Sequence, residues 1–424
     1  MIKKSSSFVW IVLAIASAAI IGLYSNPHST FIGIPYIQLS GFLGQLFLNG
    51  LTLLVVPLVS SSIIYGISQM SHDQSFKRLG AKTFFFYSVT TLLAVLTALL
   101  FVNVIQPGRQ FSHAPYVESL SSSQSTLSLN AAQSHADVIG QIFLKIIPTN
   151  LFEAASSGNM LGIIFFSLFF GFSLAQIDRS LAQPVSDVVK GVFNALMKMT
   201  HFFMRAMPIG VFCLVVKAMT GQASDKLFAL LSFFMTVVIS LSVFMLLILP
   251  ALLKAAGIDP IKHFKAMAPA LITAFSTSSS AATLPITMEC VEKRAGVSNK
   301  ICSFVIPLGT SVNMAGSALY ECAAILFIAQ LYGIHLTITH QAIVVFLSLL
   351  TSMGIAGIPS GGLVAILIVL NTMGLPAEGL ALILPMDRIL DMCRTLVNVF
   401  SDTSCAVLVA HTEGEKVLEE NYDS

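Results

Sequence analysis

Residues 386–411 form a stretch that is apolar enough to cross a lipid bilayer and yet carries a regular series of polar side chains. The series is Asp387, Asp391, Arg394, Asn398 and Asp402, spaced three or four residues apart. A helix therefore places all five within about 80° of its circumference. Each Asp or Arg at mid-membrane costs roughly 2.5–3.5 kcal/mol on insertion scales. We expect this face to line a polar site or a path buried in protein; the alternative is a buried structural network of ion pairs.

The composition is that of a membrane protein with several spans. Hydrophobic residues make up 55% of the 424 residues, charged residues make up 10%, and the mean hydropathy is +0.86. Soluble domains contain about 25% charged residues. No basic block indicates binding to nucleic acid, and the six cysteines have neither metal-ligand nor disulfide spacing. We interpret them as small buried hydrophobic side chains.

The order of apolar and basic stretches predicts the topology. Residues 8–24 are expected to be an uncleaved first helix, because more membrane sequence follows them. Further segments are predicted at 41–68, 81–106, 138–177, 184–221 and 226–253, several of them longer than the ~20 residues needed to cross. Lys and Arg follow the second and sixth segments, counted from 8–24, so both termini are expected in the cytoplasm. The Ser-rich loop 107–137 is then exposed on the outer face, and 412–424 form a cytoplasmic tail.

The second half departs from simple crossings. Residues 266–288 are apolar around a polar run, Ser276 to Ser280, and both flanks are charged, which predicts a re-entrant hairpin entering from the cytoplasm. Residues 341–372 repeat this design around a Gly-rich tip and are expected to enter from outside. Between them, 301–330 is a spanning helix broken in its centre that also carries Glu321. Hairpin and broken helix, then hairpin and polar helix, form inverted repeats that bracket a midplane site in an all-α polytopic membrane protein.

Four motifs in this half resemble those of a known family. They are STSSSAATLP (276–285), PLGTSVNMAGSALYE (307–321), SMGIAGIPSGG (352–362) and DRILDMCRTLVNVFSD (387–402). Over nearly its whole length the chain is similar to the dicarboxylate/amino acid:cation symporters, the glutamate transporter family. The resemblance implies a homotrimer whose protomers each have eight transmembrane helices and two hairpins. It also implies that a transport domain moves across the membrane, like an elevator, against an immobile scaffold domain.

Carried over onto this sequence, the resemblance implies two domains. The scaffold and trimerisation domain would comprise 1–80 and 138–221. The transport domain would comprise 81–106 and 222–411, including the hairpins at about 262–292 and 341–372.

The resemblance also implies a binding site for an acidic amino acid. Arg394 would bind the side-chain carboxylate, because a planar guanidinium matches two carboxylate oxygens. Asp391 would accept hydrogen bonds from the substrate ammonium; a succinate-type substrate would leave it unpaired, which is unfavourable in a dry site. The remaining substrate contacts would come from Asn398, Thr395, Ser317, from the first hairpin tip with Ser279 and Ser280, and from the lid-like second tip with Ile358 and Gly362.

Two sodium sites are implied in the same way, since hard cations prefer oxygen ligands. One resembles a site formed by Asn398 and Asp402 with carbonyls near Gly309 and Asn313. The other lies under the lid and would use Ser311 with carbonyls around Ser352, Met353 and Ile355.

A third family cation site is expected to be lost or badly weakened. Its Asp is replaced here by Ala315 in NMAGS, although Thr90 and Thr91 remain at the matching positions of an earlier helix. These two hydroxyls could equally serve helix packing. Glu321 resembles the proton-carrying residue of some members, because removal from water favours the neutral form of a carboxyl; otherwise it is a buried, hydrogen-bonded acid without a role in transport.

The sequence therefore predicts a symporter for glutamate or aspartate coupled to sodium, protons or both, and not an enzyme. The alternative within transport is a proton-coupled C4-dicarboxylate carrier. An intramembrane aspartyl protease is disfavoured because Asp387 and Asp391 lie one turn apart on one helix, and no GxGD pattern surrounds either. Nothing in the sequence describes the open polar pore of a channel.

Overall fold

The computed structural model describes residues 34–68, 74–109, 147–156, 160–206, 223–354 and 361–418, with short pieces between 14 and 31 and between 208 and 216. The elements in these ranges are helices, apart from a short antiparallel pair of strands, β1 (Thr30–Phe31) and β2 (Ile34–Pro35). The helical class is as predicted, and the strand pair was not predicted. The first segment 8–24, the loop 107–137 and the tail beyond 418 lie largely or wholly outside the described residues.

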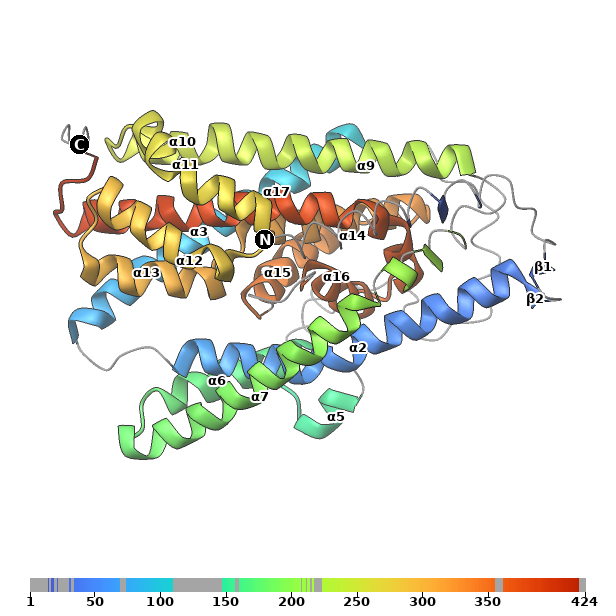
Figure 1. The fold of residues 1–424 in the computed structure, drawn as a ribbon, viewed down its shortest axis with the longest axis horizontal. Helices are drawn as coiled ribbons and strands as arrows, with labels where there is room; N and C mark the ends of the chain where they lie inside the picture. The colour runs from blue at the N-terminus through green and yellow to red at the C-terminus, as the bar shows by residue number, and fades with distance from the viewer. Residues whose placement is uncertain are drawn as a thin grey trace.

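One group of helices forms the lower layer in Figure 1. α2 (Tyr36–Ser68) packs against α6 (Met160–Leu174) and α7 (Arg179–Arg205), with the short α5 (Leu151–Ser156) beside α6. These helices share a small apolar cluster that also includes Val364, Ala365 and Ile368 from α16 (Gly361–Thr372). The predicted segment 138–177 is thus at least two helices where it is described, and α7 begins before the predicted residue 184.

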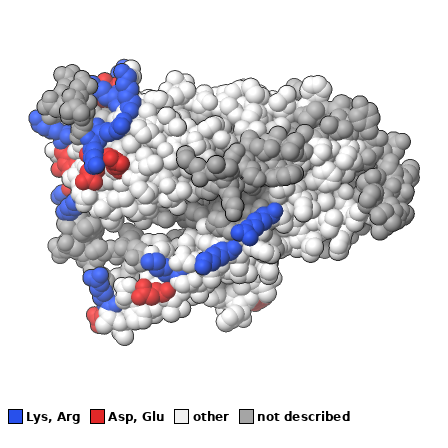
Figure 2. All heavy atoms as spheres, viewed as in Figure 1, with Lys and Arg blue, Asp and Glu red and all other residues white. Residues whose placement is uncertain are grey.

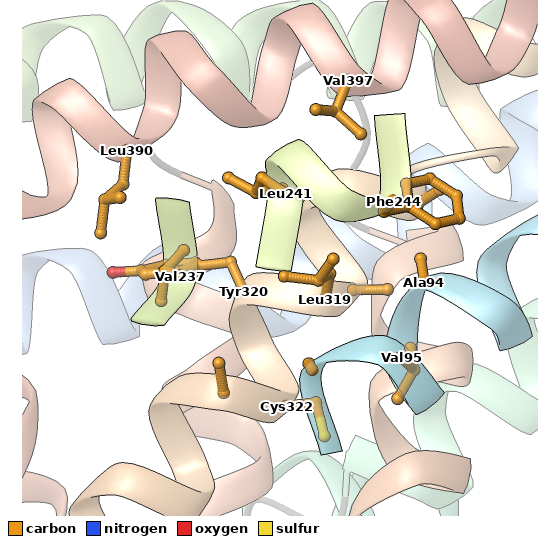
Figure 3. Packing of buried hydrophobic residues seen from close by; sticks show 14 of the residues in the cluster. Ala94, Val95, Val237, Leu241, Phe244, Leu319, Tyr320, Cys322, Leu390 and Val397 are labelled. Atoms are coloured by element: carbon orange, nitrogen blue, oxygen red, sulfur yellow. The ribbon is translucent and has the colours of Figure 1, made fainter. Parts of the chain in front are cut away.

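The second group is larger and lies above the first in Figure 1. It is built on α3 (Gln74–Ile105), α9 (Ala223–Val243), α14 (Ala315–Leu331) and α17 (Leu380–Thr412), which pack on one another. α9 continues through a π-helical turn, η3 (Phe244–Ile248), into α10 (Leu249–Ala255). α14 is buried at every residue from Ala318 to Ala329. The core between these helices, shown in Figure 3, is made by Ala94, Val95, Val237, Leu241, Phe244, Leu319, Tyr320, Cys322, Leu390 and Val397.

Helix pairs occur where both hairpins were predicted. In the first, α11 (Pro260–Thr277) and α12 (Ser280–Glu289) pack together, and the chain turns at Ser278, which has a left-handed φ of 50°. Ser279 then caps α12 by accepting a hydrogen bond from the backbone N–H of Ala282 at 3.2 Å. A π-helical turn, η4 (Cys290–Arg294), follows α12. The second pair is α15 (Ile338–Gly354) and α16, and the tip between them, 355–360, lies outside the described residues.

The helix predicted to break in its centre does so. α13 (Asn299–Val312) ends at Asn313, and α14 begins at Ala315. Pro307 and Gly309 lie inside α13, so the break is confined to Asn313 and Met314. A short 3-10 turn, η5 (Ala377–Gly379), leads from α16 into α17.

The residues after α17 fasten its end to neighbouring helices. Glu413 forms ion pairs with Arg78 and, at 2.6 Å, with Lys82 of α3, while Glu415 accepts a hydrogen bond from the backbone N–H of Ser298 at 2.9 Å. Hydrogen bonds from Lys82 and then Arg78 lower the pKa of Glu413. Figure 2 shows Lys and Arg, together with Asp and Glu, gathered at this end of the molecule.

Candidate functional site

The polar face predicted for residues 386–411 centres on a fully buried arginine. Arg394 of α17 donates from Nη2 to Asp391 at 2.8 Å and to Asp387 at 3.1 Å, and its side chain is 1% exposed. The three side chains come from successive turns of one helix, as the spacing predicted. In this structure they form the buried ion-pair network that the sequence offered as an alternative.

This network does not use every hydrogen-bond donor of the guanidinium. The guanidinium carbon lies 4.1 Å above the ring centroid of Tyr320 on α14, a cation–π contact. Nε and Nη1 of Arg394 have no hydrogen-bond partner within the described part of the chain. Two buried N–H donor groups on different edges of the guanidinium thus remain for a ligand to pair with. Tyr320 was missed by the sequence argument, although it lies one turn after Ser317 on the same helix.

Gly362 lies against this guanidinium. A Cβ at Gly362 would come within 2.2 Å of Nη1 of Arg394 and 3.4 Å of the Tyr320 ring. Its position on α16 confirms that the second hairpin reaches the arginine. The other predicted residue of that tip, Ile358, lies outside the described residues.

Asp391 has more positive neighbours than the sequence suggested. Besides Arg394, the guanidinium of Arg388 lies 3.5 Å from its Oδ2. Oδ2 of Asp391 has no hydrogen bond among the described residues, so it can still accept one from a ligand.

Asn398 joins α17 to the start of α14. Its Oδ1 accepts hydrogen bonds from the backbone N–H groups of Gly316 at 2.8 Å and Ser317 at 3.3 Å, and its Nδ2 donates to the Ser317 hydroxyl at 3.3 Å. Asn398 therefore caps the second half of the broken helix across 82 residues of sequence. These contacts engage Oδ1, the atom of Asn398 that could bind sodium, and also Nδ2, the donor that could bind a substrate carboxylate.

The remaining predicted substrate residues make mostly local hydrogen bonds. Thr395 donates to the Asp391 carbonyl at 2.8 Å. Ser279 caps α12 and Ser280 is buried, and neither hydrogen-bonds to Arg394 in the described chain. The first hairpin nevertheless packs against α17.

Asp402 is the strongest candidate cation ligand. Its carboxylate is buried and accepts a hydrogen bond from Nδ2 of Asn313 at 2.9 Å, and no Lys, Arg or His of the described residues pairs with it. A Cβ on Gly309 would lie 2.7 Å from both Asp402 Oδ1 and the Tyr87 hydroxyl, so these oxygens crowd the α13 backbone. A buried carboxylate that has no positively charged partner but has other oxygen atoms close by suits a monovalent hard cation.

At the α13–α14 break, the side-chain oxygen of Asn313 already accepts hydrogen bonds from Thr90 and Thr91. Both hydroxyls donate to Oδ1 of Asn313, at 3.3 and 3.2 Å, and Thr90 also donates to its own helix backbone. Ala315 is buried at the first turn of α14 and brings no ligand atom. These hydrogen bonds join α3 to the break, and whether Thr90 and Thr91 also bind a cation stays a prediction.

Little of the second sodium site is described. Ser352 is buried and donates to the Leu349 carbonyl at 3.0 Å. The side chains of Ser311 and Met353, and all of Ile355, lie outside the described residues. This site stays a prediction.

Glu321 is buried next to the second hairpin. Its Oε2 accepts a hydrogen bond from the Thr351 hydroxyl at 2.8 Å, and no described Lys, Arg or His forms an ion pair with it. The contact with Thr351 joins α14 to α15 of the second hairpin.

The sequence of the chain is similar to known proteins over most of its length. The model of the sodium:dicarboxylate symporter family matches residues 8–412. The chain is 35% identical over 408 residues to a proton/sodium-glutamate symport protein of Bacillus caldotenax, covering 96% of this chain and 94% of that protein. It is 34% identical to a proton/glutamate-aspartate symporter of Escherichia coli (strain K12), covering 96% and 93%. It is also 31% identical to a C4-dicarboxylate transport protein of Bacillus subtilis (strain 168), covering 88% and 87%.

Because the family model matches almost the whole chain and similar proteins align along nearly their full lengths, the polar face of α17 lies in a known type of membrane carrier. The chain belongs to the sodium:dicarboxylate symporter family.

Proposed function

We propose that this chain is a secondary active symporter that imports an acidic amino acid, glutamate or aspartate. The observation that carries the proposal is Arg394, a buried guanidinium held by two carboxylates with Nε and Nη1 left without partners among the described residues. Desolvated donors of this kind favour a ligand that brings its own carboxylate. The names of the glutamate and aspartate symporters to which the chain is similar support the same substrate class.

A C4-dicarboxylate is the second candidate. The sequence argument against it was that Asp391 would remain unpaired without a substrate ammonium. In the structure Asp391 already pairs with Arg394 at 2.8 Å and lies 3.5 Å from Arg388, which weakens that argument. Asp391 still has one oxygen free of hydrogen bonds within the described chain, and we infer that an ammonium binds there.

We propose that transport is coupled to sodium, protons or both. Asp402, with backbone carbonyls near Gly309 and Asn313, would hold one sodium ion and balance its charge. Glu321 would carry a proton, released or taken up as the Thr351 contact changes. Because residue 315 is alanine and not an acid, the third cation site of the family would contribute little to coupling.

The arrangement of the helices supports an elevator mechanism. The apolar cluster of α2, α6 and α7 is distinct from the large cluster around α14. The second hairpin meets it through aliphatic side chains of α16, and α15 also contacts α2 and α6. Such contacts lack the directional bonds that would fix one position of the transport domain. Exposed apolar residues on the proposed scaffold helices α2 and α6 would face lipid or the other protomers of a homotrimer; they include Phe42, Leu46, Leu53, Phe169 and Phe172.

The basic end of the molecule supports a cytoplasmic position for the C-terminal tail (Figure 2). We infer that the protein lies in a cell membrane with both termini inside.

The test is uptake of radiolabelled L-glutamate, L-aspartate and succinate into proteoliposomes. One set of vesicles has an inward sodium gradient, and the other has only an inward proton gradient. Sodium-driven uptake of the amino acids supports coupling through Asp402. Uptake driven by the proton gradient alone supports coupling through Glu321. Uptake of succinate with no uptake of either amino acid would replace the first substrate proposal with the second.

A further inference from the structure

A polar hollow lies far from the substrate site, at the end of α3 and α14. Its volume is about 380 Å³, and its lining includes Asn103, Gln106, Arg109, Gln330, His335 and Gln341. Ser317 and Gln330 are separated by thirteen residues of α14, which is about 20 Å along a helix. The hollow is therefore separate from the site around Arg394.

The hollow is basic, and its walls are held in place. Arg109 donates to Gln106 Oε1 at 3.1 Å, and its Nη2 lies 3.4 Å from Nδ1 of His335. None of the described residues that line the hollow is acidic. Because Arg can only donate, Nδ1 of His335 accepts, and Nε2 of the neutral ring is then a donor. Three N–H groups of Arg109 and one of His335 remain for an oxyanion.

The turn that presents Arg109 is fitted tightly to α14. A Cβ on Gly108 would lie 2.8 Å from the backbone of Phe327 and Leu331, and its N–H donates to the Gln330 side chain at 3.1 Å. Gln106 has a φ of 52°, a conformation unfavourable for a residue other than Gly. This turn is therefore preorganised, and the backbone that carries Arg109 is held in one position.

The hollow also lies where lipid headgroups are found. It adjoins the last residue of the apolar span Arg78–Ile105. Leu92, Leu96, Leu100 and Val104 form a stripe on α3 that leads to it, and their exposure rises from 39% at Leu92 to 70% at Val104. An oxyanion bound at Arg109 can thus be continuous with an acyl chain lying along this stripe.

We propose that this hollow binds the phosphate of an anionic phospholipid, whose acyl chain lies along the α3 stripe. A guanidinium with fixed orientation matches phosphate oxygens. A lipid bound here would link the C-terminal end of α3 to α14 and to the segment that carries His335.

The test titrates the purified full-length protein, in neutral detergent, with dioctanoyl-phosphatidylglycerol, dioctanoyl-phosphatidylcholine and glycerol phosphate, and counts bound ligand by native mass spectrometry. Arg109→Gln is expected to weaken phosphatidylglycerol binding at least about tenfold, through loss of charge-assisted hydrogen bonds. Arg179→Gln, on exposed Arg179 at the start of α7, makes the same change of charge outside the hollow and should bind as the wild type does.

A double variant, Leu100→Ser with Val104→Ser, separates lipid from free anion. It should weaken binding of phosphatidylglycerol and leave binding of glycerol phosphate unchanged. Equal phosphatidylglycerol binding by the wild type and Arg109→Gln overturns the proposal. Glycerol phosphate bound as tightly as the lipid also overturns it, and would identify a site for free anions.

Discussion

Replacing Gly362 by alanine tests whether the fork of Arg394 is positioned for substrate. The new Cβ would lie 2.2 Å from Nη1 of Arg394. Nonbonded heavy atoms rest about 3.5 Å apart, so the guanidinium or α16 must move by about 1 Å. The guanidinium is the end of a flexible side chain, but Asp387, Asp391 and the Tyr320 ring hold it on the other sides.

A shift of this size would remove at least one charge-assisted hydrogen bond between Arg394 and a substrate carboxylate. Such a bond is worth roughly 1.5–3 kcal/mol, which corresponds to a loss of about 10- to 150-fold in affinity. We expect Gly362→Ala to raise the Kd for glutamate and aspartate by this factor, with little change in the temperature of unfolding.

The assay is calorimetric binding of L-aspartate and L-glutamate to the purified protein in saturating sodium, followed by uptake into proteoliposomes. Gly191→Ala on α7 is the matched control, because a Cβ there meets no atom within 4 Å. Wild-type affinity in Gly362→Ala would refute the assignment of Nη1 to the substrate. An equal loss in Gly191→Ala would show that the effect is not specific to the arginine.

Four further variants test other contacts. Arg394→Cys should abolish uptake of acidic amino acids and permit uptake of neutral ones; unchanged glutamate uptake would remove Arg394 from the carboxylate site. Asp402→Asn should weaken the sodium dependence of substrate binding at least about tenfold, and a wild-type sodium titration would exclude Asp402 as a ligand. Asn398→Ala leaves two buried N–H groups of α14 unsatisfied and should destabilise the protein by about 1–3 kcal/mol, measured by denaturant unfolding; an unchanged midpoint would contradict the capping role. Glu413→Gln should reduce the acid sensitivity of unfolding, since the lowered pKa of Glu413 gives a stabilisation that is present above the ordinary carboxyl pKa and is lost as pH falls through the lowered one; parallel pH profiles of the two proteins would argue against it.

The helical period of the sequence was enough to predict the polar face of α17. Asp387 and Asp391 both accept hydrogen bonds from Arg394 because residues three, four and seven apart share one side of a helix. The first hairpin turn and the break at Asn313 were also predictable. Local signals define both: a run of serines that can cap a helix, and a cluster of Asn and Gly inside an apolar span.

The contacts that the sequence did not predict join distant segments. Asn398 was expected to contact substrate and sodium, and in the structure its oxygen caps α14, because the broken helix places unsatisfied N–H groups beside α17. Arg388 pairs with Asp391, which the sequence analysis had not considered. Residue type gives the capacity of a group to donate or accept, whereas its partner depends on which helices pack together.

By itself, the sequence determined that this chain is a helical membrane protein with a charged face on its last long helix, because hydropathy and helical period are properties of local sequence. Only the tertiary structure decided how that face is used. It stacks the Arg394 guanidinium on Tyr320, brings Gly362 against Nη1 and leaves two donors without partners among the described residues. These contacts join three helices distant in sequence, and only their packing fixes the distances between the side chains.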